Sequence, residues 1–259
     1  MLNNIVFGKY FPRDSIIHNL HPFVKLISTL LLVLSLVFIR SWILLLLFIL
    51  LLVGVVYLSK IPIKLYTNNI LKLKSFLIAL IIINTIFSGN LFEGIFVVIK
   101  ITMMITISSV LLFTTSVSEM LIGLNMLFSP LQLIHISTTK LVYSLSLALR
   151  FIPILSEQAD KILKSQYSRG LYMKDLKWKE RINVLKSIVF PMFSLSFRRA
   201  DFLAEAMEVR LFSLSNKRTN YRGRKMLKKD ILVIIVSIIL FVLIIIFEQL
   251  IMMKILKKY

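Results

Sequence analysis

The sequence predicts an all-α integral membrane protein with about five transmembrane helices and a group of long cytoplasmic helices. The 259 residues are 58% hydrophobic, well above the roughly 45 to 50% of soluble domains. Several apolar runs approach the roughly 20 residues that a helix needs to cross the hydrocarbon core. The stretch between 156 and 230 breaks this pattern with about one charged residue in three, and no segment alternates as a strand would.

Five apolar runs are predicted to span the membrane. They cover residues 24–39, 42–58, 76–87, 95–113 and 231–250. Only Arg40 and Ser41 separate the first two runs, which predicts a tight helical hairpin. Residues 121–134 and 141–155 could form a further hairpin in the membrane, so the number of spans stays open at this point.

Basic residues predict the orientation of these spans. Lysines crowd the connection after the second run, whereas the connection after the third run carries no basic residue. The lysines in question are Lys60, Lys64, Lys72 and Lys74. Because positive charge is retained on the cytoplasmic side, the N-terminus is expected inside. Five spans then place the C-terminus outside. This disagrees with the three lysines among the last nine residues, which favour the cytoplasmic side.

The charged stretch predicts a second kind of region. Residues 156–230 contain 18 Lys and Arg and 8 Asp and Glu, and a charge at the centre of a bilayer costs about 2.5 kcal/mol or more. We therefore divide the chain into N-terminal transmembrane helices (1–113), a cytoplasmic or interfacial segment of helices (114–230), and a C-terminal transmembrane helix with its tail (231–259).

Most catalytic chemistry is missing from the sequence. It has no cysteine, its glycines never form a GxxxxGK[ST] phosphate cradle, and no serine has a credible base. His18, His21 and His135 are its only histidines, and too few carboxylates lie nearby for a metal site. We expect no catalytic residue, cofactor or metal. The net charge of +20 fits lysine and arginine on the cytoplasmic side better than nucleic-acid binding, and Lys100 is the main charge inside a span.

Two helices in the charged stretch share one design. In "ILSEQADKILKSQYSRGLYM" and in "FRRADFLAEAMEVRLFS", charged residues recur on one face and an arginine ends the pattern. Pro153 and Pro191 precede these helices and are expected to start or kink them. An arginine near a helix C-terminus has an ordinary explanation in the helix dipole, and Gly170 in a C-cap. Two such helices on a chain without an ATPase motif of its own favour docking on a partner protein. A guanidinium suits this role because it offers a rigid fork of five donors.

Several motifs in order resemble one known family. They are "HPFVKLI", "TTSVSEMLIGLNMLFSPL", "LALRFIPILSEQADKILKSQYSRG", "FRRADFLAEAMEVRLF" and "RTNYR". Together the sequence resembles the transmembrane T component of energy-coupling factor transporters, which is related to the cobalt-transport membrane protein CbiQ. The resemblance covers most of the chain and implies a multi-pass protein of the bacterial plasma membrane with cytoplasmic coupling helices.

The resemblance also implies partners and roles. Each coupling helix would end in an arginine motif that docks one of two ABC-type ATPases, and the membrane part would move a separate substrate-binding S component for vitamin or micronutrient uptake. By match, the docking residues are Ser168, Arg169 and Gly170 in the first motif, and Val209, Arg210 and Leu211 in the second. The expected supporting residues are Arg150, Pro153, Glu157, Pro191, Arg199, Glu205 and Glu208. Leu211 stands where the family motif has glycine, which removes the easy terminator of the second helix.

Three alternative functions make different demands on the sequence. A dedicated cobalt or nickel importer would use a T component of the same design. A membrane-bound enzyme that modifies lipids would need convergent acids or a metal site, which the sequence does not offer. An ordinary ABC permease would bring one coupling helix per subunit, and the paired arginine helices argue against it.

Overall fold

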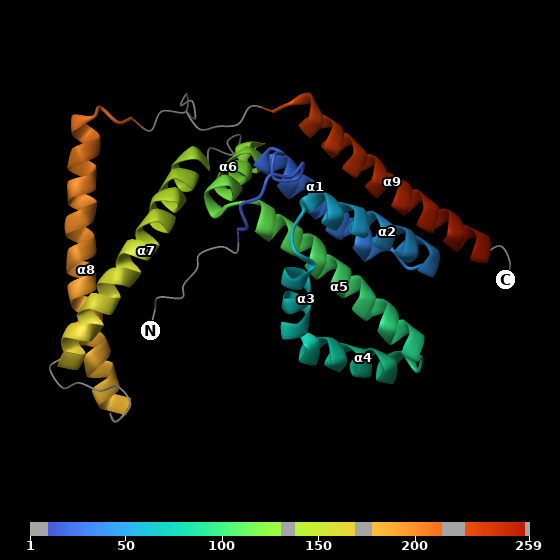
Figure 1. The fold of residues 1–259 in the computed structure, drawn as a ribbon, viewed down its shortest axis with the longest axis horizontal. Helices are drawn as coiled ribbons and strands as arrows, with labels where there is room; N and C mark the ends of the chain where they lie inside the picture. Colours follow the sequence, from blue (N-terminus) through green and yellow to red (C-terminus); the bar gives the residue numbers. More distant parts are fainter. Residues whose placement is uncertain (1–9, 131–137, 169–177, 214–225, 257–259) are drawn as a thin grey trace. The chain divides into compact units, whose positions relative to one another are not determined.

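The computed structural model describes residues 10–130, 138–168, 178–213 and 226–256. These ranges contain α-helices and no strand (Figure 1), as the sequence predicts. The helices are α1 (Pro22–Phe38), α2 (Trp42–Ser59), α3 (Ile63–Lys72), α4 (Lys74–Ser88), α5 (Leu91–Thr114), α6 (Val117–Leu127), α7 (Thr138–Ser168), α8 (Trp178–Val209) and α9 (Lys228–Leu256).

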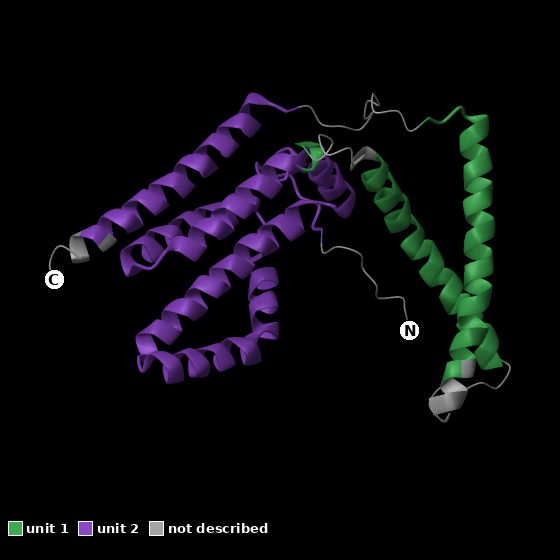
Figure 2. Cartoon of the chain, turned by 180° about the vertical axis from the view of Figure 1, so that it is seen from behind, with its two compact units in different colours: residues 1–7, 128–221 green, residues 8–127, 222–259 purple. Residues whose placement is uncertain are grey.

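The chain forms two compact units (Figure 2). One comprises residues 8–127 and 222–259 and holds α1 to α6 and α9; we call it the membrane unit. The other comprises residues 1–7 and 128–221 and holds α7 and α8; we call it the α7–α8 unit. The division of the chain at 114 and 231 stays a prediction.

Three helices of the described ranges are long and apolar enough to cross a membrane. They are α2, α5 and the Lys228–Ile251 part of α9. The pair α3 and α4, bent by 59° at its junction, passes the same test as one broken span. α1 is a shorter apolar helix of 17 residues, and it matches the first of the five predicted runs. The lysine-rich connection expected after α2 is itself helical, because residues 63–72 form α3.

α1 lies at the centre of the membrane unit, where it packs against α5, α6 and α9. Leu36 and Ile39 at its end are fully buried in a cluster with Phe48 of α2, Ile107 of α5 and Ile244 of α9. Close packing of this kind holds helices together in lipid, where burial from water contributes little. The centre of the unit is therefore built on the first predicted span.

α6 joins this unit through a close approach to α1. Ser116 and Glu119 form a capping box at its start, in which each side chain accepts from the other residue's backbone N–H. A Cβ atom on Gly123 would lie 2.7 Å from Leu26 Cδ1 and 3.0 Å from the Phe23 nitrogen. Only glycine fits there without displacement, which agrees with the small-residue packing expected of membrane helices.

Three charged side chains bind backbone groups at the two ends of α1. Lys100 Nζ donates to the carbonyls of Val37 and Ile39, each at 2.8 Å. These carbonyls belong to the C-terminal end of α1, where the helix leaves them without an internal donor. The charge that sequence inspection singled out inside a span is therefore a structural clamp.

Two buried carboxylates on α9 complete this arrangement. Glu248 accepts the backbone N–H groups of Arg40 and Ser41 at 2.7 and 2.8 Å. Asp230 accepts the backbone N–H of His21 at 2.9 Å and that of Leu227 at 2.8 Å. The two acids lie about five helical turns apart, so α9 is bonded to the start of α1 and to the hairpin after its end.

Candidate functional site

The second arginine motif lies at the end of α8, where the backbone turns sharply. The N–H of Leu211 donates to the Glu208 carbonyl and the N–H of Phe212 to the Met207 carbonyl, both at 2.9 Å. Leu211 has φ 51, the left-handed region that usually takes glycine. This pair of bonds is a Schellman motif with leucine at its left-handed position. The expectation that α8 lacks a terminator without glycine is therefore wrong.

An aromatic contact from α7 holds this turn. The rings of Tyr143 and Phe212 lie 5.0 Å apart between centroids, and the Tyr143 hydroxyl donates to Met207 Sδ at 3.4 Å. A Schellman turn commonly places an apolar residue after the turn against one in the last helical turn. This packing offsets the strain at Leu211, which is about 1 to 2 kcal/mol for a residue other than glycine in the left-handed region.

Sequence reasoning missed Tyr143, Met207 and Phe212. The spacing of five between Met207 and Phe212, across an exposed arginine, is the signal that could have found the turn. Tyr143 carried no such signal, because its contact joins residues that are distant in sequence.

The turn displays the second arginine motif to solvent. Arg210 is exposed and no described residue bonds its guanidinium, while Val209 and Leu211 on either side are 85% and 91% exposed. The result is a cation between two bare apolar side chains at the C-terminal end of a helix. A groove with carbonyl or carboxylate acceptors and an apolar rim would complement this surface.

The first motif is only partly within the described residues. Ser168 is the last residue of α7, and its hydroxyl donates to the Lys164 carbonyl at 3.1 Å. Arg169 and Gly170 lie outside the described residues. Their docking role, like that of Arg210, stays a prediction.

The expected supporting residues occupy different places on α7 and α8. Arg150, Glu157, Glu205 and Glu208 are exposed, and Arg199 is half-buried. Pro153 and Pro191 lie inside α7 and α8. Of the two roles expected for them, starting these helices is therefore wrong, and kinking them stays a prediction. A proline removes one helical hydrogen bond, yet both helices continue across it because their other bonds and their packing remain.

α8 also carries an apolar face that the α7–α8 unit leaves bare. Phe190, Phe193 and Phe197 recur at helical spacing and are 82%, 61% and 66% exposed. The rings of Phe193 and Phe197 stack at 6.3 Å between centroids. Exposed apolar patches of this kind mark interaction surfaces. Within the described ranges, no group of three His, Asp or Glu side chains could hold a metal ion.

Comparison with known proteins decides the family. Residues 13–221 match the CbiQ family, described as cobalt transport protein. The chain belongs to this family. The match includes α1 to α8 and both arginine motifs.

Three similar proteins from this comparison share one name. The chain is 32% identical to the energy-coupling factor transporter transmembrane protein EcfT of Bacillus subtilis (strain 168), over 93% of this chain and 97% of the relative. It is 30% identical to the protein of that name from Bacillus selenitireducens, over 92% and 95%. For the Staphylococcus aureus protein the values are 29%, 94% and 98%.

Membership of the CbiQ family confirms several predictions. The chain is a multi-pass membrane protein of the kind found in the bacterial plasma membrane, and it is a non-catalytic transporter subunit. The resemblance to the T component of energy-coupling factor transporters is likewise confirmed.

Proposed function

We propose that the chain couples two ABC-type ATPases to a membrane-embedded S component in an importer for vitamins or other micronutrients. The observation that carries this proposal is the end of α8. There a Schellman turn displays Arg210 without a described partner between two exposed apolar side chains. A surface of this composition supports docking into a partner's groove more than it supports a role in internal packing.

The length of α8 supports transmission of movement. A helix of 32 residues is about 48 Å long, and the docking surface lies at one end. An ATPase that closes on ATP and holds Arg210 would displace that end of α8. The bare phenylalanine face of α8 would carry the movement to an apolar partner such as an S component.

Ser168, Arg169 and Gly170 would dock the second ATPase at the end of α7. The sequence of this chain has no phosphate cradle, so both ATPases would bind nucleotide themselves. The coupling helices would therefore lie in the cytoplasm, where the ATPases act.

The transported substrate divides the main proposal from its alternative. The matching family is described as cobalt transport protein, which favours a cobalt or nickel importer. The relatives matched over more than nine-tenths of the chain carry the energy-coupling factor name. We place the chain with the energy-coupling factor importers on that ground.

The test is co-purification of the tagged chain with the ATPases, quantified as ATPase copies per chain. Arg210→Glu and Arg169→Glu should each lose about one of the two ATPases, and the double variant should lose both, since reversing a central arginine charge costs at least about 2 kcal/mol of binding. Arg198→Glu is the matched control, because Arg198 is exposed on the same helix about 18 Å from Arg210.

Wild-type ATPase levels in both single variants would show that the docking assignment is wrong. Arg210→Lys sharpens the test, since it keeps the charge and loses the rigid fork. We expect it to recruit less ATPase than the wild type and more than Arg210→Glu.

A further inference from the structure

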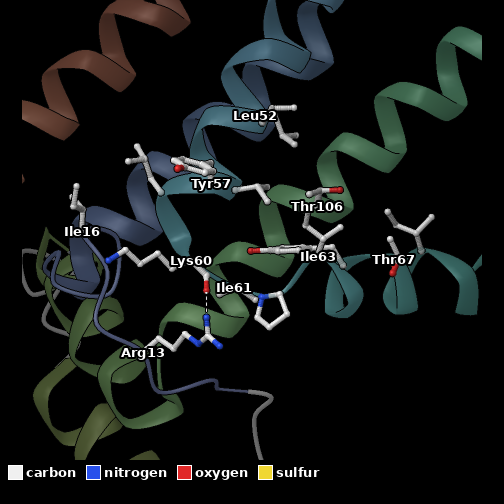
Figure 3. Close-up of a pocket in the computed structure, with 15 residues that line it drawn as sticks. Arg13, Ile16, Leu52, Tyr57, Lys60, Ile61, Ile63, Thr67 and Thr106 are labelled. Carbon is white, nitrogen blue, oxygen red and sulfur yellow. Dashed lines mark hydrogen bonds between the residues drawn. The ribbon is translucent and has the colours of Figure 1, made fainter.

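A large open pocket lies in the membrane unit at the end of α2. Its volume is about 1030 Å³, and its walls come from α2, α3, α5 and the segment before α1 (Figure 3). Thr106 of α5 lines its inner side, and Arg13 and Lys60 lie at one end. The pocket is remote in sequence from both arginine motifs, and no step of the proposed coupling uses it.

Arg13 and Lys60 at this end carry hydrogen-bond donors that bind no acceptor in the described ranges. Arg13 Nη1 donates to the Lys60 carbonyl at 2.8 Å, and the guanidinium lies over the Phe11 ring at 5.3 Å from its centroid. No other acceptor within the described ranges binds the Arg13 guanidinium, and none binds Lys60 Nζ. The bond joins the Arg13 guanidinium to the backbone of Lys60, whose side chain extends away from it (Figure 3). Both cations line the same pocket.

The lining of the pocket carries no negative charge. None of its described lining residues is aspartate or glutamate. Two basic residues therefore line the pocket and no carboxylate does, which favours an anionic ligand.

The rest of the pocket is apolar and follows a membrane-spanning helix. Leu52, Val53 and Val56 line it from α2, and Ile63 and Ile70 from α3. Val53 and Ile63 are 59% and 70% exposed, so this wall is open rather than filled by the protein. Tyr57, which is 82% exposed, lies between the apolar wall and the cations (Figure 3), where aromatic residues meet lipid headgroups.

We propose that this pocket binds one anionic phospholipid. The anionic headgroup would be attracted by Arg13 and Lys60, and an acyl chain would lie along the apolar wall of α2 and α3. A phospholipid joins an anionic head to an apolar chain, which matches both ends of the pocket. Basic pockets between transmembrane helices on the cytoplasmic side bind anionic headgroups in this way.

The experiment is native mass spectrometry of the delipidated full-length chain in neutral detergent. The chain is titrated with phosphatidylglycerol or with phosphatidylethanolamine of the same acyl chains, and bound lipid is counted. The wild type should retain phosphatidylglycerol more strongly. Lys60→Asn should weaken that binding about fivefold, the equivalent of about 1 kcal/mol for one cation near a headgroup.

The variants are chosen to separate this pocket from general basicity. Lys60 has φ 55, and asparagine tolerates that left-handed backbone, so Lys60→Asn removes the charge and keeps the carbonyl that Arg13 binds. Lys64→Gln is the control, since Lys64 is exposed on α3 and does not line the pocket. It should retain phosphatidylglycerol as the wild type does.

Equal binding of the two lipids by the wild type would overturn the proposal. So would an equal loss in Lys60→Asn and Lys64→Gln, because bound lipid would then report the basic surface alone. Should Lys60→Asn fail to fold, the comparison of the two lipids on the wild type and on Arg13→Gln decides. Failure here would leave the docking role of Arg210 untouched.

Discussion

The buried and half-buried charged residues of the membrane unit and the exposed ones of the α7–α8 unit are used in opposite ways. In the membrane unit, Lys100, Asp230 and Glu248 bind backbone groups at helix ends. In the α7–α8 unit, Glu205 and Arg210 are exposed. A charge in hydrocarbon must be paired, whereas a charge in water is available to a partner. Charges in the membrane unit therefore join its own helices, whereas the exposed charges of the α7–α8 unit agree with the proposed docking role.

Apolar residues show the same contrast. α2 exposes Leu50 by 78% and Tyr57 by 82%, as expected of a helix whose outer face meets lipid. α8 exposes its phenylalanines on a helix that also carries a stripe of acids, including Asp201, Glu205 and Glu208. A helix with both faces bare is incompletely packed on its own, which agrees with a role in a complex.

The largest effect on stability is expected for Glu248→Leu. This change leaves the N–H groups of Arg40 and Ser41 and the Ser41 hydroxyl without their acceptor. Each unsatisfied donor costs about 1 kcal/mol at the lower end of the usual range, because these donors are only partly buried. The free energy of unfolding should therefore fall by about 3 kcal/mol. The measurement is the thermal unfolding midpoint of the purified chain in neutral detergent.

Glu205→Leu on α8 is the matched control for that contrast. Glu205 is exposed, and a surface substitution changes stability by only about 0.5 kcal/mol. If Glu205→Leu lowered the midpoint as much as Glu248→Leu, the two units would not differ in how they use charge.

A smaller effect is expected for Leu211→Gly. Glycine adopts the left-handed backbone without strain, so the end of α8 should gain about 0.5 to 1 kcal/mol of local stability. Hydrogen exchange of the amides of Leu211 and Phe212 is the measurement, and both should slow. Tyr143→Ala should speed the same amides, because the ring that packs on Phe212 is removed. Faster exchange in Leu211→Gly would contradict the Schellman assignment.

The smallest effect concerns pH and the segment before α1. His18 Nε2 donates to the Phe11 carbonyl at 3.0 Å, since a carbonyl only accepts, and Nδ1 accepts from Ser15 Oγ at 2.6 Å. Burial lowers the pKa of His18, and the charge of Lys25 adds to this, against the bond to Phe11 and the charges of Asp14 and Glu119. The unfolded chain therefore binds a proton at higher pH than the folded chain.

The sign of the pH effect follows from linkage. Stability contributed by neutral His18 is fully present above the ordinary histidine pKa of about 6.5 and is lost as pH falls through the lower folded value. The free energy of unfolding should decrease from pH 7.5 to pH 5, and His18→Gln should show a shallower decrease. Identical pH dependence in the two proteins would show that His18 does not titrate in this way.

Many helices of the membrane unit could be predicted from sequence, because the length of an apolar run indicates where a membrane-spanning helix begins and ends. α2, α5 and α9 match three predicted spans to within a few residues at most ends. The helix α3, the first half of the bent pair α3 and α4, was not predicted, since its lysines and asparagines resemble a loop. Glu248 was overlooked inside an apolar run, because its partners near residues 40 and 41 are distant in sequence.

The candidate site was predicted only in part. The position of Arg210 at a helix end followed from the charge pattern, and α8 does end at Val209. The turn after it was not predicted, because glycine was expected at its left-handed position and leucine adopts that backbone. Packing of Tyr143 on Phe212 stabilises this turn. A tertiary contact of this kind leaves no local pattern in the sequence.

The measurement that tests the central claim most directly is site-specific cross-linking from the end of α8. The chain has no cysteine, so Val209→Cys supplies a single thiol beside Arg210 for a photoactivatable maleimide. Phe190→Cys is the control, because Phe190 is also exposed on α8 but lies about 28 Å away along the helix. We predict an adduct with an ABC-type ATPase from position 209 and none from position 190. No ATPase adduct from position 209, or equal adducts from both positions, would contradict the account.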